Sequence, residues 1–365
     1  MWQRETSSQD RQVNPEMIRL ARESRGLIQG ELATKLGVSQ GHFSKVEAGI
    51  VVSQRDLVEG LSRVLDFPPE FFFQIDRVYG PSTSEFYHRK RKSAQARTLD
   101  QIHANINIRR IHLGRLLRSV EPPPCAIPKI DPEEFDGDVG EIARAVRSAF
   151  QVPKGPIRNV IEIIEDAGGI VIKMPFDSRF VDAVSWWVPG LPPVFYVNDS
   201  MPADRERLTL CHELGHLVMH QIARPDMEDE ANKFAAEFLM PADEIRPHLR
   251  EVSLQSLSAM KPYWKVSMQA LLKRAADLET ITPARASYLW ALIAKNGYKL
   301  KEPAELDFPN EEASLLGEIL ESHITDLKYD LPQLAKLFAV YERQVVSDYH
   351  VMTPKVAMGH LRRVK

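Results

Sequence analysis

Two histidines four residues apart, His212 and His216, restrict what this chain can fold into more than any other feature of its sequence. Residues four apart lie on one face of an α-helix, so both imidazoles would face the same way, with Glu213 beside them. Two imidazole nitrogens can hold zinc at about 2.0–2.1 Å, and a neighbouring carboxylate can accept a proton from the attacking water. The spacing therefore predicts a helix that carries two zinc ligands and a general base.

A zinc site of this kind needs a third protein ligand, for which residues 227–241 offer three glutamates. Ile222 stands where the third histidine of a metzincin motif would fall, so we expect a ligand from a second helix, the gluzincin arrangement. We assign Glu228 to this role, with Glu230 and then Glu237 as alternatives.

This part of the sequence resembles the ImmA/IrrE family of metallopeptidases, in the segments RERLTLCHELGHLVMH and EDEANKFAAEFLMP. The resemblance extends over about residues 140–242 and implies that Glu228 falls on the glutamate ligand of the family's E-x-x-A-N segment. It implies one zinc ion per chain and peptide-bond hydrolysis in a protein substrate, often a repressor or a partner in a stress or mobile-element circuit. Candidates for stabilising the tetrahedral intermediate are Tyr196, His220 and Tyr263. His220 could instead be a metal ligand, but a histidine at this position more often favours a helix C-terminus.

The segment before the motif predicts a small sheet. Strand-like runs occur at 170–174, 183–188 and 194–197, and prolines and a glycine between the last two predict a hairpin. Substrates of zinc peptidases commonly add as a further strand to an exposed sheet edge, so we expect one hairpin strand to bind the substrate backbone.

The N-terminal part of the chain carries a second constraint. Its sequence, PEMIRLARESRGLIQGELATKLGVSQGHFSKVEAG, predicts three short helices in which Gly37 makes a left-handed turn and Ser39 caps the third helix. Two helices joined in this way form a helix-turn-helix whose second member enters the major groove of DNA. The stretch resembles the Xre/Cro-type repressor DNA-binding domain.

The outward side of the third helix supplies most of the predicted DNA contacts. Gln pairs with adenine, Lys reaches guanine or phosphate, and Gln29 at the start of the preceding helix is placed to bind phosphate. The predicted DNA-binding residues are Gln29, Ser39, Gln40, Gly41, His42, Ser44 and Lys45. The alternative is a helical module that binds a protein.

Charge is distributed unevenly along the chain. Residues 1–120 contain 19 Lys and Arg against 13 Asp and Glu, a net +6, whereas the rest contains 28 against 37, a net −9. This asymmetry indicates a polyanion partner for the N-terminal third. The cationic run at 88–92 could add phosphate contacts, although such a charge run is usually a solvated face.

The apolar runs and the cysteines of the sequence predict a cytoplasmic protein. We expect neither a signal peptide nor a membrane partner, because no apolar run follows the first residues and no segment reaches the length of a membrane span. Two distant cysteines, Cys125 and Cys211, fit a reducing cytoplasm. Helix-turn-helix proteins usually read two half-sites, so we expect a homodimer on a double-stranded operator.

These patterns predict a mainly α protein with an α+β zincin domain. We expect a five-helix helix-turn-helix domain at 14–78, a basic amphipathic helical linker at 79–125, a zinc peptidase domain at 126–250 and a helical regulatory region at 251–365. Within the last region, QLAKLFAV at 333–340 echoes ELATKLGV at 31–38.

The predicted function is that of a DNA-binding transcriptional regulator with a zinc endopeptidase that cleaves a repressor or another regulatory protein. The alternative is a transcription factor whose zinc-site domain is a non-catalytic sensor of metal, ligand or partner. Glu213→Gln separates the two, since only the first hypothesis predicts loss of a cleavage event with the metal retained.

Overall fold

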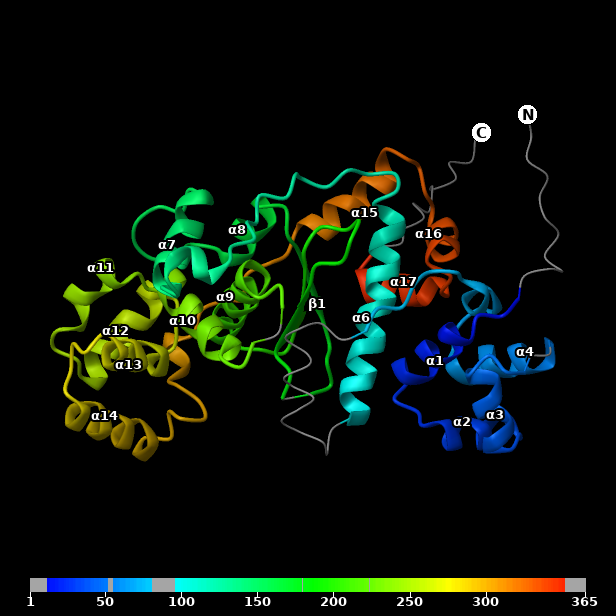
Figure 1. Ribbon diagram of the computed structural model, residues 1–365, viewed down its shortest axis with the longest axis horizontal. Coiled ribbons are helices and arrows are strands. Elements are labelled where there is room, and N and C mark those ends of the chain that lie inside the picture. The colour runs from blue at the N-terminus through cyan, green and yellow to red at the C-terminus, as the bar shows by residue number, and fades with distance from the viewer. Residues whose placement is uncertain (1–11, 52–54, 81–95, 179, 223, 352–365) are drawn as a thin grey trace, which may run out of the picture. The chain divides into compact units, whose positions relative to one another are not determined.

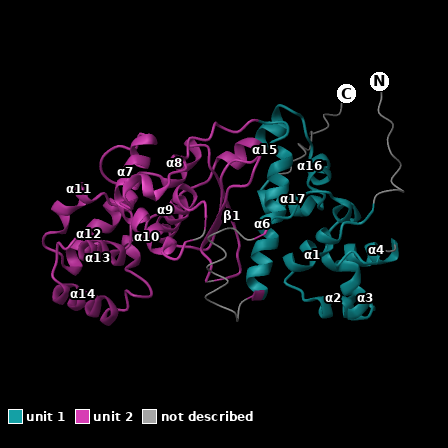
Figure 2. Ribbon diagram, viewed as in Figure 1, with its two compact units in different colours: residues 1–79, 97–120, 320–365 teal, residues 80–96, 121–319 magenta. Residues whose placement is uncertain are grey.

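The computed structural model describes residues 12–51, 55–80, 96–178, 180–222 and 224–351 (Figure 1). The chain divides into two compact units (Figure 2). Unit 1 comprises residues 1–79, 97–120 and 320–365, and unit 2 comprises residues 80–96 and 121–319. Most of unit 2 is therefore an insertion into the chain of unit 1. The cationic run at 88–92 lies outside the described residues.

Unit 1 begins with the predicted helix-turn-helix. Its elements are α1 (Pro15–Ser24), α2 (Gln29–Leu36), α3 (Gln40–Glu47), α4 (Arg55–Leu65) and the 3-10 helix η1 (Pro69–Phe73). Gly37 ends α2 with a φ of 70°, and Ser39 caps α3 by accepting a hydrogen bond from the His42 N–H, as predicted. Phe43 and Val46 of α3 are buried against the other helices. The fifth predicted helix is only the short 3-10 helix η1.

Within the predicted amphipathic linker the helix is α6 (Ala96–Leu116), and two C-terminal helices of unit 1 pack against it, α16 (Leu331–Phe338) and α17 (Glu342–Tyr349). Helix α15 (Leu315–Thr325) spans the boundary between the two units. The His112 ring of α6 stacks on Phe338 at 4.6 Å, and its Nδ1 lies 2.7 Å from the Tyr349 hydroxyl. Arg343 pairs with Asp66, which follows α4.

The structure thus groups residues 320–349 with the helix-turn-helix, whereas the sequence pattern assigned all of 251–365 to one helical region. The reason is apolar burial, since Leu334, Phe338 and Val345 are covered within unit 1. The sequence-derived domain boundaries stay predictions.

The echo between the two ends of the chain corresponds to a similar local shape. Like α2 and α3, α16 and α17 have eight residues each, and the residue after α16, Ala339, has a left-handed φ of 55°. Such a conformation costs an alanine about 1 kcal/mol, which glycine avoids at position 37. Helix α17 forms ion pairs with other elements of unit 1, between Asp348 and Arg109 and between Arg343 and Asp66.

Unit 2 contains the small sheet and the helices around it. Before and within the sheet the elements are α7 (Val139–Ala149), α8 (Val160–Asp166), β1 (Ile170–Met174), β2 (Ala183–Trp186) and β3 (Val194–Asn198). The strand order is β1-β3-β2, with β1 parallel and β2 antiparallel to β3. The predicted hairpin of β2 and β3 is confirmed, and β2 lies at the sheet edge. The three strands are almost wholly buried, as expected for a sheet covered by helices.

The motif helix follows β3 directly. It is α9 (Ala203–Met219), and the helices after it are α10 (Met227–Leu239), α11 (Ala242–Ile245), α12 (Leu254–Trp264), α13 (Met268–Asp277) and α14 (Pro283–Lys295). Short 3-10 helices lie at Pro132–Phe135, Arg246–Leu249 and Ala304–Leu306. The predicted combination of a helix-turn-helix with an α+β domain is confirmed. No helix among the described residues is both long enough and apolar enough to cross a membrane.

The N-terminal half of α9 is held by a segment from much later in the chain. Arg207, with no exposed side-chain surface, pairs with Glu311, and the Glu311 carboxylate also accepts hydrogen bonds from the N–H groups of Val160 and Ile161. Lys261 of α12 donates to Asp204 of α9 at 2.9 Å. Glu311 thereby links α9, through its ion pair with Arg207, to the start of α8, through the backbone N–H groups of Val160 and Ile161.

We expect the stability of unit 1 to depend on pH through His112. Burial lowers the pKa of this ring well below 6.5, and Arg109 and Arg115 add to the effect. Below about pH 6.5 the unfolded chain binds a proton on His112 that the folded state excludes. The contribution of His112 to the free energy of unfolding is therefore complete above about pH 6.5 and is lost as the pH falls. His112→Phe, which keeps a ring against Phe338, should remove up to about 1.4 kcal/mol per pH unit from the slope below that pH.

Urea unfolding of the full chain at several pH values between 5 and 7.5 measures this slope. The matched control is His42→Gln, which replaces an exposed histidine of the same unit. Equal slopes in wild type and in His112→Phe would contradict the assignment.

Candidate functional site

Among the described residues, the structure brings His212, His216 and Glu228 together as a group that could hold a metal ion. Each of the three residues offers one ligand atom. His212 and His216 lie on α9 and Glu228 in the first turn of α10. The two Nε2 atoms are 3.0 Å apart, and Glu228 oxygens lie 3.7 Å from Nε2 of His212 and 3.4 Å from Nε2 of His216.

These separations fit a tetrahedral ion. With ligands at about 2.0–2.1 Å, two ligand atoms of a tetrahedral zinc site are about 3.3–3.4 Å apart. The two Nε2 atoms are separated by 3.0 Å, and the Glu228 oxygens at 3.7 and 3.4 Å are Oε2 for His212 and Oε1 for His216, all near that value. Two imidazoles with one carboxylate are the donor set of a catalytic zinc site with one open position. The residues present therefore fit a zinc ion.

Close packing of α9 against α10 produces this geometry. A Cβ atom added at Gly215 would lie 3.1 Å from ring carbons of Phe234, so any larger residue requires that ring to give way by a few tenths of an ångström. Ala231 and Ala235 on the facing side of α10 are fully buried. The small residues allow the Glu228 carboxylate to reach the histidines on α9.

Glu213 lies beside the histidines and is held by the edge strand. Its carboxylate accepts hydrogen bonds from the Ser185 N–H at 3.0 Å and from the Ser185 hydroxyl at 2.6 Å. Burial raises the pKa of Glu213, while His216 and the bonds from Ser185 oppose that shift. The outer edge of β2 is thus directed at the carboxylate that the sequence predicts to be the general base.

Further polar residues contact the Nδ1 atoms of the two histidines. His212 Nδ1 lies 3.1 Å from Oδ1 of Asn232, and His216 Nδ1 lies 2.9 Å from Nδ1 of His220. Glu230, one of the alternative ligands, lies 2.8 Å from Nε2 of His220. Burial lowers the pKa of His220 to about 4, so the ring is neutral at pH 7.

The other alternative ligand takes part in a separate ion-pair cluster. Glu237 is buried and pairs with Arg144 and Arg274. Whether Glu228 is the third ligand stays a prediction, and its position beside both histidines favours it over Glu230 and Glu237.

A cavity of about 290 Å³ opens beside the three residues. It is lined by Phe180, Asp182, Ala183, Arg205, Leu208, Thr209, His212, Glu213, Glu228 and Asn232. The predicted candidates for stabilising the intermediate lie elsewhere, since Tyr196 is buried in β3, Tyr263 is more than half exposed on α12, and His220 contacts the far side of His216.

Two lining residues of this cavity were missed by the sequence reasoning, although a signal for them exists. Arg205 and Thr209 precede His212 by seven and three residues, which is the spacing of one helix face. Arg205 pairs with Asp182 at the same opening. Ser185 had no comparable signal, because its contact with Glu213 joins a strand to a helix 28 residues later.

In unit 1, the predicted DNA-binding residues lie on or next to α3. Gln40, Gly41, His42 and Lys45 are exposed, and Ser44 is half-buried. The Gln29 amide donates to Glu47 at 2.6 Å, and Glu47 also pairs with the buried Arg22. This network fixes the start of α2 to the end of α3, so the residues of the two helices that would contact DNA are held in one relative orientation.

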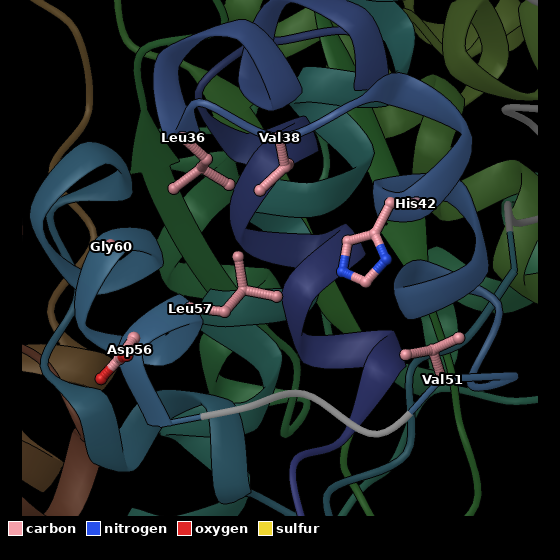
Figure 3. A pocket seen from close by; sticks show the side chains of 7 residues that line it. All are labelled: Leu36, Val38, His42, Val51, Asp56, Leu57 and Gly60. Atoms are coloured by element: carbon pink, nitrogen blue, oxygen red, sulfur yellow. The ribbon is translucent and has the colours of Figure 1, made fainter.

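A second cavity of about 290 Å³ adjoins α3 (Figure 3). It is lined by Leu36, Val38, His42, Val51, Asp56, Leu57 and Gly60. The His42 ring points into this hollow in Figure 3. A base contact by His42 stays a prediction, and it would need the ring to turn outward.

Comparison with known families gives two matches. Residues 16–71 match a family described as the helix-turn-helix domain. Residues 164–276, from the end of α8 through most of α13, match a peptidase family described as the IrrE N-terminal-like domain. Among curated proteins, none matches the chain at a significant level. The chain therefore combines a helix-turn-helix match near its N-terminus with an IrrE N-terminal-like peptidase match at 164–276.

Proposed function

We propose that this protein is a DNA-binding transcriptional regulator whose zinc endopeptidase cleaves a regulatory protein. The observation that carries the peptidase half is the set of separations among His212, His216 and Glu228, which match a tetrahedral ion, with Glu213 next to them. The helix-turn-helix match carries the DNA-binding half.

In this proposal His212, His216 and Glu228 hold one zinc ion per chain. When bound, such an ion supplies Lewis-acid activation of water and of the scissile carbonyl. Glu213 accepts the proton from the attacking water and passes it to the leaving amine. To do so it must be ionised, and the two hydrogen bonds from Ser185 favour the carboxylate against the effect of burial.

The substrate backbone would lie along β2, the edge strand that faces α9. Arg205 and Asn232 line the cavity next to this strand and can donate hydrogen bonds to substrate carbonyl groups. An extended segment of a regulatory protein fits such a site better than a folded surface does, because backbone pairing needs an unpaired strand.

The DNA-binding half would place α3 in the major groove of a double-stranded operator, with Gln40 and Lys45 at base edges or phosphates and Gln29 at the backbone. A homodimer would read two half-sites. DNA as the partner, with Cys125 and Cys211 both free thiols, favours the cytoplasm as the compartment.

The competing proposal is a transcription factor whose zinc-site domain only senses metal, ligand or partner. Glu213 separates the two, because a sensor needs the ligands but not a general base. The Glu213 carboxylate is buried against Ser185 and borders an open cavity, where a general base could reach a water molecule. This arrangement favours the peptidase.

We expect Glu213→Gln to abolish cleavage while zinc is retained, since Glu213 is not among the proposed ligands. New protein N-termini are counted by mass spectrometry in cells that carry wild type or variant under several stresses, and zinc is measured in both purified proteins. Cleavage at the same sites in the variant would contradict the role of Glu213. If neither protein produces a new terminus while both hold zinc, the sensor function replaces this proposal.

We expect Lys45→Ala to weaken binding to DNA selected by the wild-type protein from a random-sequence pool. Loss of one phosphate contact should reduce the slope of log affinity against log salt by about 0.9. The matched control is Lys35→Ala, which removes an exposed lysine from the C-terminal end of α2. Equal slopes in the Lys45 and Lys35 variants would show that α3 does not approach phosphate at this position.

A further inference from the structure

Behind His216, two residues continue a line of hydrogen bonds away from the proposed ligands. The Nε2 atom of His216 faces Glu228 at 3.4 Å, while its Nδ1 atom lies 2.9 Å from Nδ1 of His220. The other nitrogen of His220, Nε2, lies 2.8 Å from Oε2 of Glu230. The side chain of His220 has no exposed surface, so water does not compete for its nitrogens.

The chemistry of a metal site gives each atom in this line one role. A neutral imidazole that offers the lone pair of Nε2 to a metal must carry its proton on Nδ1. The Nδ1–H group of His216 then donates to Nδ1 of His220. Because Nδ1 of His220 accepts this bond, the His220 ring must carry its own proton on Nε2. The second N–H donates in turn to the carboxylate of Glu230, which accepts only.

Without an acceptor at Glu230, nothing determines which nitrogen of His220 carries the proton. His220 could then carry its proton on Nδ1, and two N–H groups would face each other across 2.9 Å unless His216 moved its own proton to Nε2. A protonated Nε2 cannot bind a metal. The carboxylate at the end of the line therefore determines which nitrogen of His216 is free.

The helices hold the three residues in a rigid arrangement. His220 is the residue directly after the end of α9, one turn beyond His216. Its backbone N–H donates to the backbone carbonyl of His216 at 2.9 Å. Glu230 lies two residues after Glu228 on α10. Helix α10 thus provides one carboxylate for the metal side of the histidines and another for the opposite side.

We propose that His220 and Glu230 are positioning residues that hold His216 in the tautomer and ring orientation required for metal binding. This inference rests on the proposed zinc site. It excludes His220 as a ligand, since both of its nitrogens are engaged by His216 and Glu230.

The first test is the affinity of the full-length apoprotein for Zn²⁺, measured by competition with a chromogenic chelator at fixed pH. We expect His220→Phe and Glu230→Ala each to weaken binding by about 10- to 100-fold, the usual effect of losing a partner of a ligating histidine. The double variant should be no weaker than the worse single variant, because the two residues act in one line. Glu230→Gln, which keeps an acceptor oxygen, should retain most of the affinity.

The matched control is Asp229→Ala. Asp229 is exposed, precedes Glu230 on the same turn of α10 and lines the same surface cavity, so it reports the effect of removing one nearby negative charge. We expect its zinc affinity to equal that of wild type. An equal loss in Asp229→Ala and Glu230→Ala would mean that charge alone matters and would overturn the inference.

The second test separates positioning from ligation through the visible absorption spectrum of the Co²⁺-substituted protein at saturation. A positioning role leaves the band positions and intensities of His220→Phe and Glu230→Ala like those of wild type, whereas loss of a ligand changes both. A changed spectrum, or unchanged affinity in both variants, would overturn the inference while leaving the zinc site in place. A folded wild type that binds neither ion would overturn the proposed function itself, and this inference with it. If His220→Phe does not fold, Glu230→Ala, at a partly exposed side chain, still decides the outcome.

Discussion

The contact between α9 and α10 is the interaction on which the candidate metal centre depends. The proposed ligands come from two helices, so their separations are set by how closely the helix axes approach. Gly215 allows that approach, because a Cβ atom there would meet the Phe234 ring at 3.1 Å. The geometry of a polar site is thus determined by apolar packing, since close-packed interiors resist displacement and side chains tethered to them cannot drift by an ångström.

Buried charge pairs contribute to fixing the N-terminal half of α9. Arg207 is fully buried and donates to the carbonyls of Ile157 and Lys265 as well as to Glu311. Breaking a buried pair of this kind costs about 3–5 kcal/mol, a large part of the 5–15 kcal/mol that stabilises a typical domain. These directional bonds add to the apolar packing and define one register of α9. That register decides which residues face the β2 edge.

Local patterns were enough to predict the elements that carry the site, but not the contacts that complete it. The four-residue spacing of His212 and His216, the left-handed turn at Gly37 and the cap at Ser39 are encoded within a few residues, and the structure has the predicted helices and turn there. The pairing of Ser185 with Glu213, of Glu311 with Arg207 and of Tyr349 with His112 joins positions 28, 104 and 237 residues apart. No periodicity in one sequence records such pairs, because either partner alone resembles an ordinary polar residue.

The order of the chain places most of unit 2, which contains the peptidase match, between two parts of unit 1, which contains the helix-turn-helix match. The chain leaves unit 1 after Val120 and returns to it at Leu320, so this stretch of unit 2 is covalently joined to unit 1 at both ends. The returning helices α16 and α17 are not an independent appendage, since Phe338 and Tyr349 complete the environment of His112 on α6. A terminal fusion would have one covalent connection through which a change in one domain could reach the other. An insertion has two, and here both lead into helices that share a core with the helix-turn-helix. The stretch 121–319 is therefore anchored in unit 1 through α6 at one end and through α15 at the other.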